Sequence, residues 1–154
     1  MNFSGSRILL LLTCVLTLPA CNDEAQDTHP DQPVTHRRQL FKQFTRTLEP
    51  MGMVARDRLP FNRTEFLASA RDLQQLAGKP WSLFTPDSNY PPTHAKPEVW
   101  LKPFEFKAAQ QALQDKASAL AALAREGSLD DLKAAVNDLQ RSCKSCHDQC
   151  RNDS

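Results

Sequence analysis

Apolar residues recur every three or four positions along most of this 154-residue chain, and this period constrains the fold more than any other feature. Side chains at that spacing share one face of an α-helix, so each periodic stretch predicts an amphipathic helix. No stretch shows the strict alternation that is typical of a half-buried strand. Mostly short turns join the helices, which favours an all-α fold, an antiparallel four-helix bundle. The four stretches run from about Val34 to Arg58, from Asn62 to Gly78, from Pro97 or Pro103 to Glu126, and from Ser128 through Cys150.

Capping signals and prolines mark the course of these helices. Asn62 is a favoured N-cap residue, and Glu65 stands three positions later, where its side chain can complete a capping box. Ser128, followed by Asp131, is expected to cap the last helix. Pro50 lacks a backbone N–H and should kink the first helix one turn earlier.

The stretch between the second and third helices, residues 79–97, contains five prolines and predicts a long loop. Trp81 and Phe84 in this loop are expected to pack over one end of the core. Loops of this length are often functional.

The N-terminus has the features of an export signal. Arg7 supplies a positive charge ahead of an apolar run from Ile8 to Leu18, which is too short to span a bilayer comfortably. The run ends before Cys21 in a sequence that resembles a bacterial lipobox, and cleavage there would leave Cys21 to carry lipid. An ordinary signal peptide, with Cys21 incidental, is the alternative. The expected organisation is a signal peptide over residues 1–20, a flexible tether over 21–33 and the bundle over 34–154.

Cys143, Cys146 and His147 form a Cys-x-x-Cys-His motif in the last helix. This is the attachment pattern of c-type haem. Two thiols three residues apart on a helix can each reach one vinyl group of the same porphyrin, and His147 can then place its imidazole under the iron as the proximal ligand. The cysteines also continue the apolar stripe of this helix, so we expect them to face the core. The sequence therefore predicts one covalently attached haem c.

Two other uses of these residues stay open on the motif alone. A Cys-x-x-Cys pair also occurs in thiol redox sites and as half of a zinc site. With Cys150, a Cys-x-x-Cys-His-x-x-Cys zinc cluster is conceivable, but four ligands in so short a helical stretch cannot easily surround a zinc ion as a tetrahedron. Outside such a cluster, Cys150 would be an inert buried thiol.

Charge and motif content exclude several classes of function. The formal net charge is +1, with acidic and basic residues interspersed, whereas a nucleic-acid surface needs clustered Lys and Arg. No Ser-His-Asp arrangement, marked pair of carboxylates or phosphate-binding loop appears in the sequence. Enzyme activity and nucleic-acid binding are therefore not predicted.

Several short segments occur in a characteristic order along the chain. They are Arg37 four residues before Phe41, Leu59-Pro60-Phe61, Leu76 to Trp81 with Phe84, Lys96 to Trp100 leading into Phe106-Lys107, and Ser142 to Arg151. In this order they resemble the cytochrome c′ family, a class of exported four-helix c-type cytochromes with the haem near the C-terminus. The resemblance covers about residues 34–151, and the ordered set is more specific than the haem motif by itself.

The resemblance implies that His147 binds the haem iron and that no strong protein ligand occupies the opposite side. By register from the turn at Pro60, Phe41 covers that open side, where Leu is common in the family. The resemblance also implies that Arg37 lies near a haem propionate and that Arg151 lies beside the proximal histidine.

Three further residues complete the haem pocket that the resemblance implies, namely Arg38, Met51 and Lys96. Without the resemblance, the readings are plainer. Phe41 and Met51 fit an apolar stripe and would be core residues, and Arg37 would be a solvated helix residue.

The expected function is the binding of small gases such as nitric oxide and carbon monoxide, with nitric oxide detoxification implied by the resemblance. An apolar wall offers no hydrogen bond to bound dioxygen, so an oxygen carrier is not favoured. The alternative is a six-coordinate electron-transfer cytochrome without a gas-binding role. We expect a periplasmic homodimer that meets a membrane only through an N-terminal lipid, and the sequence does not identify a redox partner.

Overall fold

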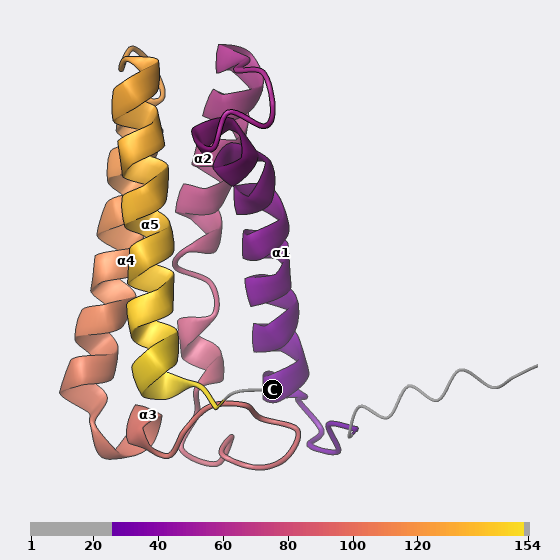
Figure 1. The fold of residues 1–154 in the computed structure, drawn as a ribbon. Coiled ribbons are helices and arrows are strands. Elements are labelled where there is room, and N and C mark those ends of the chain that lie inside the picture. Colours follow the sequence, from indigo (N-terminus) through magenta and orange to yellow (C-terminus); the bar gives the residue numbers. More distant parts are fainter. Residues whose placement is uncertain (1–25, 153–154) are drawn as a thin grey trace, which may run out of the picture.

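The computed structural model describes residues 26–152, so the expected signal peptide and the lipidation candidate Cys21 lie outside the described residues. Four long helices run side by side, and the described part of the chain contains no strand (Figure 1). The predicted four-helix bundle is therefore confirmed. The long helices are α1 (Pro33–Ala55), α2 (Arg63–Leu76), α4 (Pro103–Leu123) and α5 (Leu129–Cys150).

Each long helix packs against two neighbours that run in the opposite direction. Helix α1 contacts α2, α2 contacts α4, α4 contacts α5, and α5 closes the ring against α1. Because the direction alternates, the last turns of α5 lie at the same end of the bundle as the beginnings of α1 and α4 (Figure 1). The Cys-x-x-Cys-His motif belongs to those last turns.

The apolar stripes predicted from the sequence face one another inside the bundle. Burying one such side chain contributes about 1.5–3 kcal/mol relative to leaving it in water. No helix in the described part of the chain is both long and apolar enough to cross a membrane. The fully buried leucine and valine side chains of the core include Leu73, Leu120, Leu132, Val136 and Leu139.

Side-chain caps begin α2 and α5, as the sequence predicts. The Asn62 side chain accepts hydrogen bonds from the backbone N–H groups of Thr64 and Glu65, at 3.0 and 3.4 Å. The Ser128 hydroxyl accepts one from the N–H of Asp131 at 3.2 Å. These bonds satisfy N–H groups that have no partner within the helix.

Prolines shape the first and third helical stretches. Pro50 lies inside α1, which continues beyond it to Ala55. The third stretch is divided, because a short helix α3 (Glu98–Leu101) precedes α4 and Pro103 opens α4. Proline cannot donate to the preceding turn but is favoured in the first turn of a helix, so a new helix begins at Pro103.

The long loop predicted between the second and third helices covers the end of the bundle that holds the motif. It contains a short 3-10 helix, η1 (Trp81–Leu83), and its last residues are bonded to the C-terminal segment. The N–H of Lys96 donates to the carbonyl of Cys150 at 2.9 Å, and the N–H of Asn152 donates to the carbonyl of His94 at 2.8 Å. These bonds hold the loop against the end of α5.

Replacing Leu139 by Ala should destabilise the bundle by about 2–5 kcal/mol, because the fully buried side chain would leave a cavity. Urea denaturation followed by circular dichroism measures this change. Leu101→Ala is the matched control: Leu101 is 75% exposed, so the free energy of unfolding should change by less than about 0.5 kcal/mol. Equal effects of the two substitutions would contradict the assignment of the α5 stripe to the core.

Candidate haem-attachment site

The last turns of α5 present the two motif cysteines, the histidine and the third cysteine. Cys143, Cys146 and Cys150 are half-buried free thiols, and Cys143 packs against the hydrophobic core. His147 is exposed. The expectation that the cysteines face the core is thus met only in part. The stripe passes from fully buried Leu139 to half-buried thiols as α5 approaches the end of the bundle.

Burial raises the pKa of both motif cysteines. The pKa of the Cys143 thiol rises because apolar side chains surround it. Burial, reinforced by the neighbouring Cys150, raises the pKa of Cys146 to about 12. Both sulfurs are therefore protonated at neutral pH. A thiol redox site depends on a thiolate with a lowered pKa, so this pair lacks the property that such a site needs.

The imidazole of His147 is held in its neutral form. Although His147 is exposed overall, the desolvation of its ring lowers its pKa, the positive charge of Arg151 lowers it further, and Asp148 acts in the opposite direction. A neutral imidazole keeps the nitrogen lone pair that a metal ligand requires. The N–H of Arg151 also donates to the carbonyl of His147 at 3.0 Å, so the two residues are joined through the backbone.

These donor groups fit a porphyrin better than a zinc ion. Within residues 26–152, no three His, Cys, Asp or Glu side chains converge in a way that could hold a metal ion. A haem c needs only two thiols spaced along one helix and an imidazole next to them, and α5 supplies that set. The zinc alternative therefore finds no support in the geometry.

An aromatic cluster lies at the motif end of the bundle. The ring centroids of Phe41 and Trp81 are 5.6 Å apart, and those of Phe84 and Phe106 are 5.0 Å apart, both in edge-to-face geometry. Trp100 packs against Phe84, with 6.3 Å between the ring centroids. All of these rings except that of Phe41 line a cavity of about 300 Å³. Trp81 packs against the core, as predicted. Phe84 contacts the rings of Trp81 and of buried Phe106.

The aromatic cluster presents hydrocarbon surfaces rather than hydrogen-bond donors. The indole N–H of Trp81 donates to the carbonyl of Ala77 at 2.6 Å, and that of Trp100 donates to the carbonyl of Thr85 at 2.8 Å. The phenylalanine rings have no donor. Both tryptophan donors are thus used within the protein.

Arg37 is only 3% exposed and anchors the long loop. One terminal nitrogen donates to the Leu83 carbonyl and the Ser88 hydroxyl at 2.9 and 2.7 Å. The other donates to the Ser88 carbonyl and the Thr93 hydroxyl at 3.0 and 2.6 Å. The guanidinium also lies over the Phe84 ring, 4.4 Å from its centroid. This burial contradicts the plainer expectation of a solvated helix residue.

The other expected pocket residues lie in different parts of the bundle. Lys96 lies at the end of α5, where its ammonium group donates to the carbonyl of Asp148 at 2.9 Å. Arg38 is half-buried on α1. Met51 is 2% exposed in the core and lies about 15 Å further along α1 than Phe41, toward the opposite end of the bundle.

Sequence reasoning missed a polar network where the chain enters the bundle. Asp27 is 4% exposed, and its carboxylate accepts hydrogen bonds from the Thr35 N–H at 2.8 Å and the Tyr90 hydroxyl at 2.7 Å. His29 stacks on the Tyr90 ring. The segment expected to be a flexible tether is therefore bonded to the bundle from Asp27 onward.

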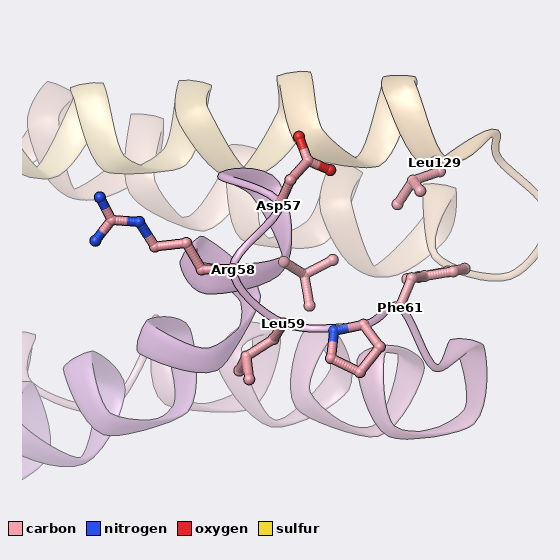
Figure 2. Close-up of a pocket in the computed structure, with 7 residues that line it drawn as sticks. Asp57, Arg58, Leu59, Phe61 and Leu129 are labelled. Carbon is pink, nitrogen blue, oxygen red and sulfur yellow. The ribbon is translucent and has the colours of Figure 1, made fainter.

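A second cavity, of about 360 Å³, lies at the opposite end of the bundle, where the turn between α1 and α2 approaches the start of α5 (Figure 2). No cysteine or histidine lines it. Asp57 in its wall pairs with Lys133 of α5, and Arg58 points away from the other labelled residues (Figure 2). This cavity is separate from the motif. It is lined by Val54, Asp57, Arg58, Leu59, Pro60, Phe61 and Leu129.

Comparison with known proteins identifies the family. A family model described as cytochrome c′ matches residues 32–151. The chain belongs to the cytochrome c′ family. The predicted resemblance is confirmed over essentially the whole described bundle.

Relatives named cytochrome c′ cover most of the chain and nearly all of their own length. That of Alcaligenes xylosoxydans xylosoxydans is 33% identical over 126 residues, which make up 82% of this chain and 98% of the relative. That of Cereibacter sphaeroides is 30% identical over 149 residues, which make up 94% of this chain and 97% of the relative.

Solved cytochrome c′ structures have the same fold. A ferrous variant from Alcaligenes xylosoxidans with bound nitric oxide matches with a TM-score of 0.77 and 31% identity, over 84% of this chain and 100% of that chain. A carbon monoxide-bound variant from the same organism matches with a TM-score of 0.76 and 32% identity, over 83% of this chain and 100% of that chain. Proteins of the cytochrome c′ family bind a covalently attached c-type haem, and the free thiols of α5 have the spacing that such an attachment needs.

Replacing Arg37 by Met should destabilise this cytochrome c′ family member by about 2–4 kcal/mol, because buried oxygen atoms of the loop would lose their donors. Hydrogen exchange of residues 83–93 should also become faster. Arg46→Met at an exposed position of α1 is the matched control and should change stability by less than about 0.5 kcal/mol. A loss as small as in the control would show that Arg37 does not anchor the loop.

Tyr90 is the only tyrosine of the chain, so its ionisation can be followed by ultraviolet difference absorbance. Burial, together with the hydrogen bond to Asp27 and the charge of Asp27, raises the pKa of Tyr90 from 10.0 to about 12. A raised pKa stabilises the fold below about pH 10, and this contribution is lost as the pH rises toward 12.

We therefore expect a titration midpoint near 12 for the native protein, and a lower midpoint for Asp27→Asn, which removes the negative charge. A midpoint at the ordinary value in both proteins would mean that the network between Asp27 and Tyr90 does not form in solution.

Proposed function

We propose that this chain is an exported haem protein that binds small gases, above all nitric oxide, at a haem c held by Cys143, Cys146 and His147. The observation that carries the proposal is the arrangement at the end of α5, where two half-buried thiols three residues apart are followed directly by an imidazole. A haem held by these residues would supply an iron atom that can bind a small gas, with His147 as its protein ligand. The solved relatives with bound nitric oxide and carbon monoxide support this role.

The chain's own residues would hold the histidine in place. The backbone bond from Arg151 to the His147 carbonyl and the bond from Lys96 to the Asp148 carbonyl both restrain the end of α5. The backbone bonds between the long loop and the C-terminal segment also restrain the end of α5. A ligand fixed in this way requires little reordering when it binds the iron.

The aromatic cluster favours nitric oxide and carbon monoxide over dioxygen. Bound dioxygen is stabilised by a hydrogen-bond donor in the distal pocket. Phe41 offers none, and the N–H groups of Trp81 and Trp100 are already used. Nitric oxide and carbon monoxide bind ferrous haem without such a donor. The proposed role is therefore to bind or remove nitric oxide, and electron transfer through the same haem is compatible with it.

We further propose a periplasmic location, a lipid anchor at Cys21 and a homodimer. The location and anchor rest on the export signal and the lipobox-like sequence, and the dimer rests on family membership. The protein is proposed as a binding and redox protein rather than an enzyme.

Visible spectra of the purified protein test the proposal. The ferric and ferrous forms should give five-coordinate, high-spin spectra, and the ferrous spectrum should change when nitric oxide is added. A six-coordinate, low-spin spectrum that does not respond to nitric oxide would favour the electron-transfer alternative instead.

Cysteine variants test the attachment. Cys143→Ser and Cys146→Ser should each lose one thioether bond and retain less haem on a denaturing gel. Cys150→Ser is the matched control, because this third half-buried thiol on α5 lies outside the motif, and it should retain all of the haem. Equal haem retention in all three variants would contradict the assigned attachment.

Phe41→Ala should raise the association rate of carbon monoxide by roughly tenfold or more. Phe41 makes two edge-to-face contacts, with Trp81 and Phe84, and each such contact contributes about 0.5–1.5 kcal/mol. Both contacts would break if the ring moved aside for a ligand, so their loss in the variant lowers the barrier to ligand binding. Flash photolysis of the carbon monoxide complex measures the rate. Phe61→Ala, in the turn between α1 and α2, is the control, and a rate change of the same size there would contradict the position assigned to Phe41.

A further inference from the structure

We propose that the corner between α3 and α4 is a membrane-contact surface, at which Leu101 and Phe104 enter the interfacial layer of the bilayer that anchors the chain. The inference rests on the N-terminal anchor of the proposed function, and adds a second, protein-made contact to it. The partner is a lipid bilayer surface.

The corner exposes the two most accessible large apolar side chains of the described residues. Phe104 is 85% exposed and Leu101 is 75% exposed. On α4 the buried face passes through Phe106, and a residue two positions earlier points about 200° away from it. Phe104 therefore cannot turn into the core without unwinding the start of the helix. Aromatic and leucine side chains presented in this way are typical of surfaces that lie in a membrane interface.

Charges around the corner favour a bilayer over a charged protein partner. Lys102 and Lys107 are exposed, and their long side chains can reach lipid phosphates while the apolar tips insert. Glu105 lies between the two lysines in the sequence, and Glu98 lies four residues before Lys102. The patch therefore carries charges of both signs. A docking site for an oppositely charged protein depends on such a single sign.

The N-terminus places this corner within reach of the membrane. Helix α3 and the start of α1 lie at the same end of the bundle (Figure 1). Because Asp27 is bonded to Thr35 and Tyr90, only residues 22–26 separate the lipidation candidate Cys21 from the bundle. Five residues span at most about 17 Å.

So short a connection keeps the corner close to the bilayer. It raises the effective concentration of the corner at the surface to the order of millimolar or more. A small apolar patch can therefore dock even though it would bind a free membrane only weakly.

Polarised absorbance of the holoprotein on an oriented bilayer of phosphatidylethanolamine and phosphatidylglycerol tests the proposal. The protein is attached through its own lipid or, if mass spectrometry finds none, through a polyhistidine tag ahead of Asn22 and a nickel-chelating lipid. A docked corner fixes the orientation of the haem, so its main absorption band should be dichroic. Hydrogen exchange at residues 99–106 should also be slower on the bilayer than in solution.

The double variant Leu101→Ser/Phe104→Ser should lose both the dichroism and the slowed exchange. Leu59→Ser is the matched control, because Leu59 is 45% exposed at the opposite end of the bundle, and it should keep both. The proposal would be overturned if the double variant kept the dichroism. It would also be overturned if the natural sequence showed no dichroism and the same hydrogen exchange on the bilayer as in solution. Slower hydrogen exchange at the corner that arises only from self-association in solution, without the bilayer, would overturn it as well. A colourless protein would instead refute the proposed haem attachment, and a mass without lipid would refute the anchor.

Discussion

The burial of one face of α5 is the constraint on which the rest of the structure depends. Leu132, Val136 and Leu139 are fully buried against α4 and α1, and a helix is too stiff to turn its last residues independently of that face. The direction of Cys143 and Cys146 is therefore decided by leucines and a valine that take no part in any chemistry. A bundle that held α5 less firmly could not present two thiols and an imidazole in a fixed relation to one porphyrin.

Polar contacts complete what the apolar core begins. The core ends before the last turns of α5, where the cysteines are only half-buried. The loop after α2 packs at that end of the bundle instead. It is held by the buried guanidinium of Arg37 and by backbone bonds to the C-terminal segment. The same loop brings Trp81 and Phe84 against Phe41, so the aromatic cluster depends on a buried cation. Packing positions the thiols, and hydrogen bonds position the loop that carries Trp81 and Phe84.

The helices, their caps and the motif could be predicted from the sequence because their signals are local. Apolar periodicity, an N-cap such as Asn62 and a Cys-x-x-Cys-His spacing all lie within a few residues. The bonds of Arg37 to Ser88 and of Asp27 to Tyr90 could not, because they join positions more than fifty residues apart and follow no period. Partial exposure of the cysteines also escaped prediction, since it depends on where α5 leaves the core rather than on its own pattern.

Mass spectrometry of the C-terminal peptide after proteolysis tests the central claim most directly. The protein should be produced in a host that matures c-type cytochromes. The peptide that contains Cys143 and Cys146 is expected to carry the mass of one haem bound through both sulfurs, with Cys150 still open to alkylation. A peptide without added mass, with all three thiols alkylated, would contradict the account.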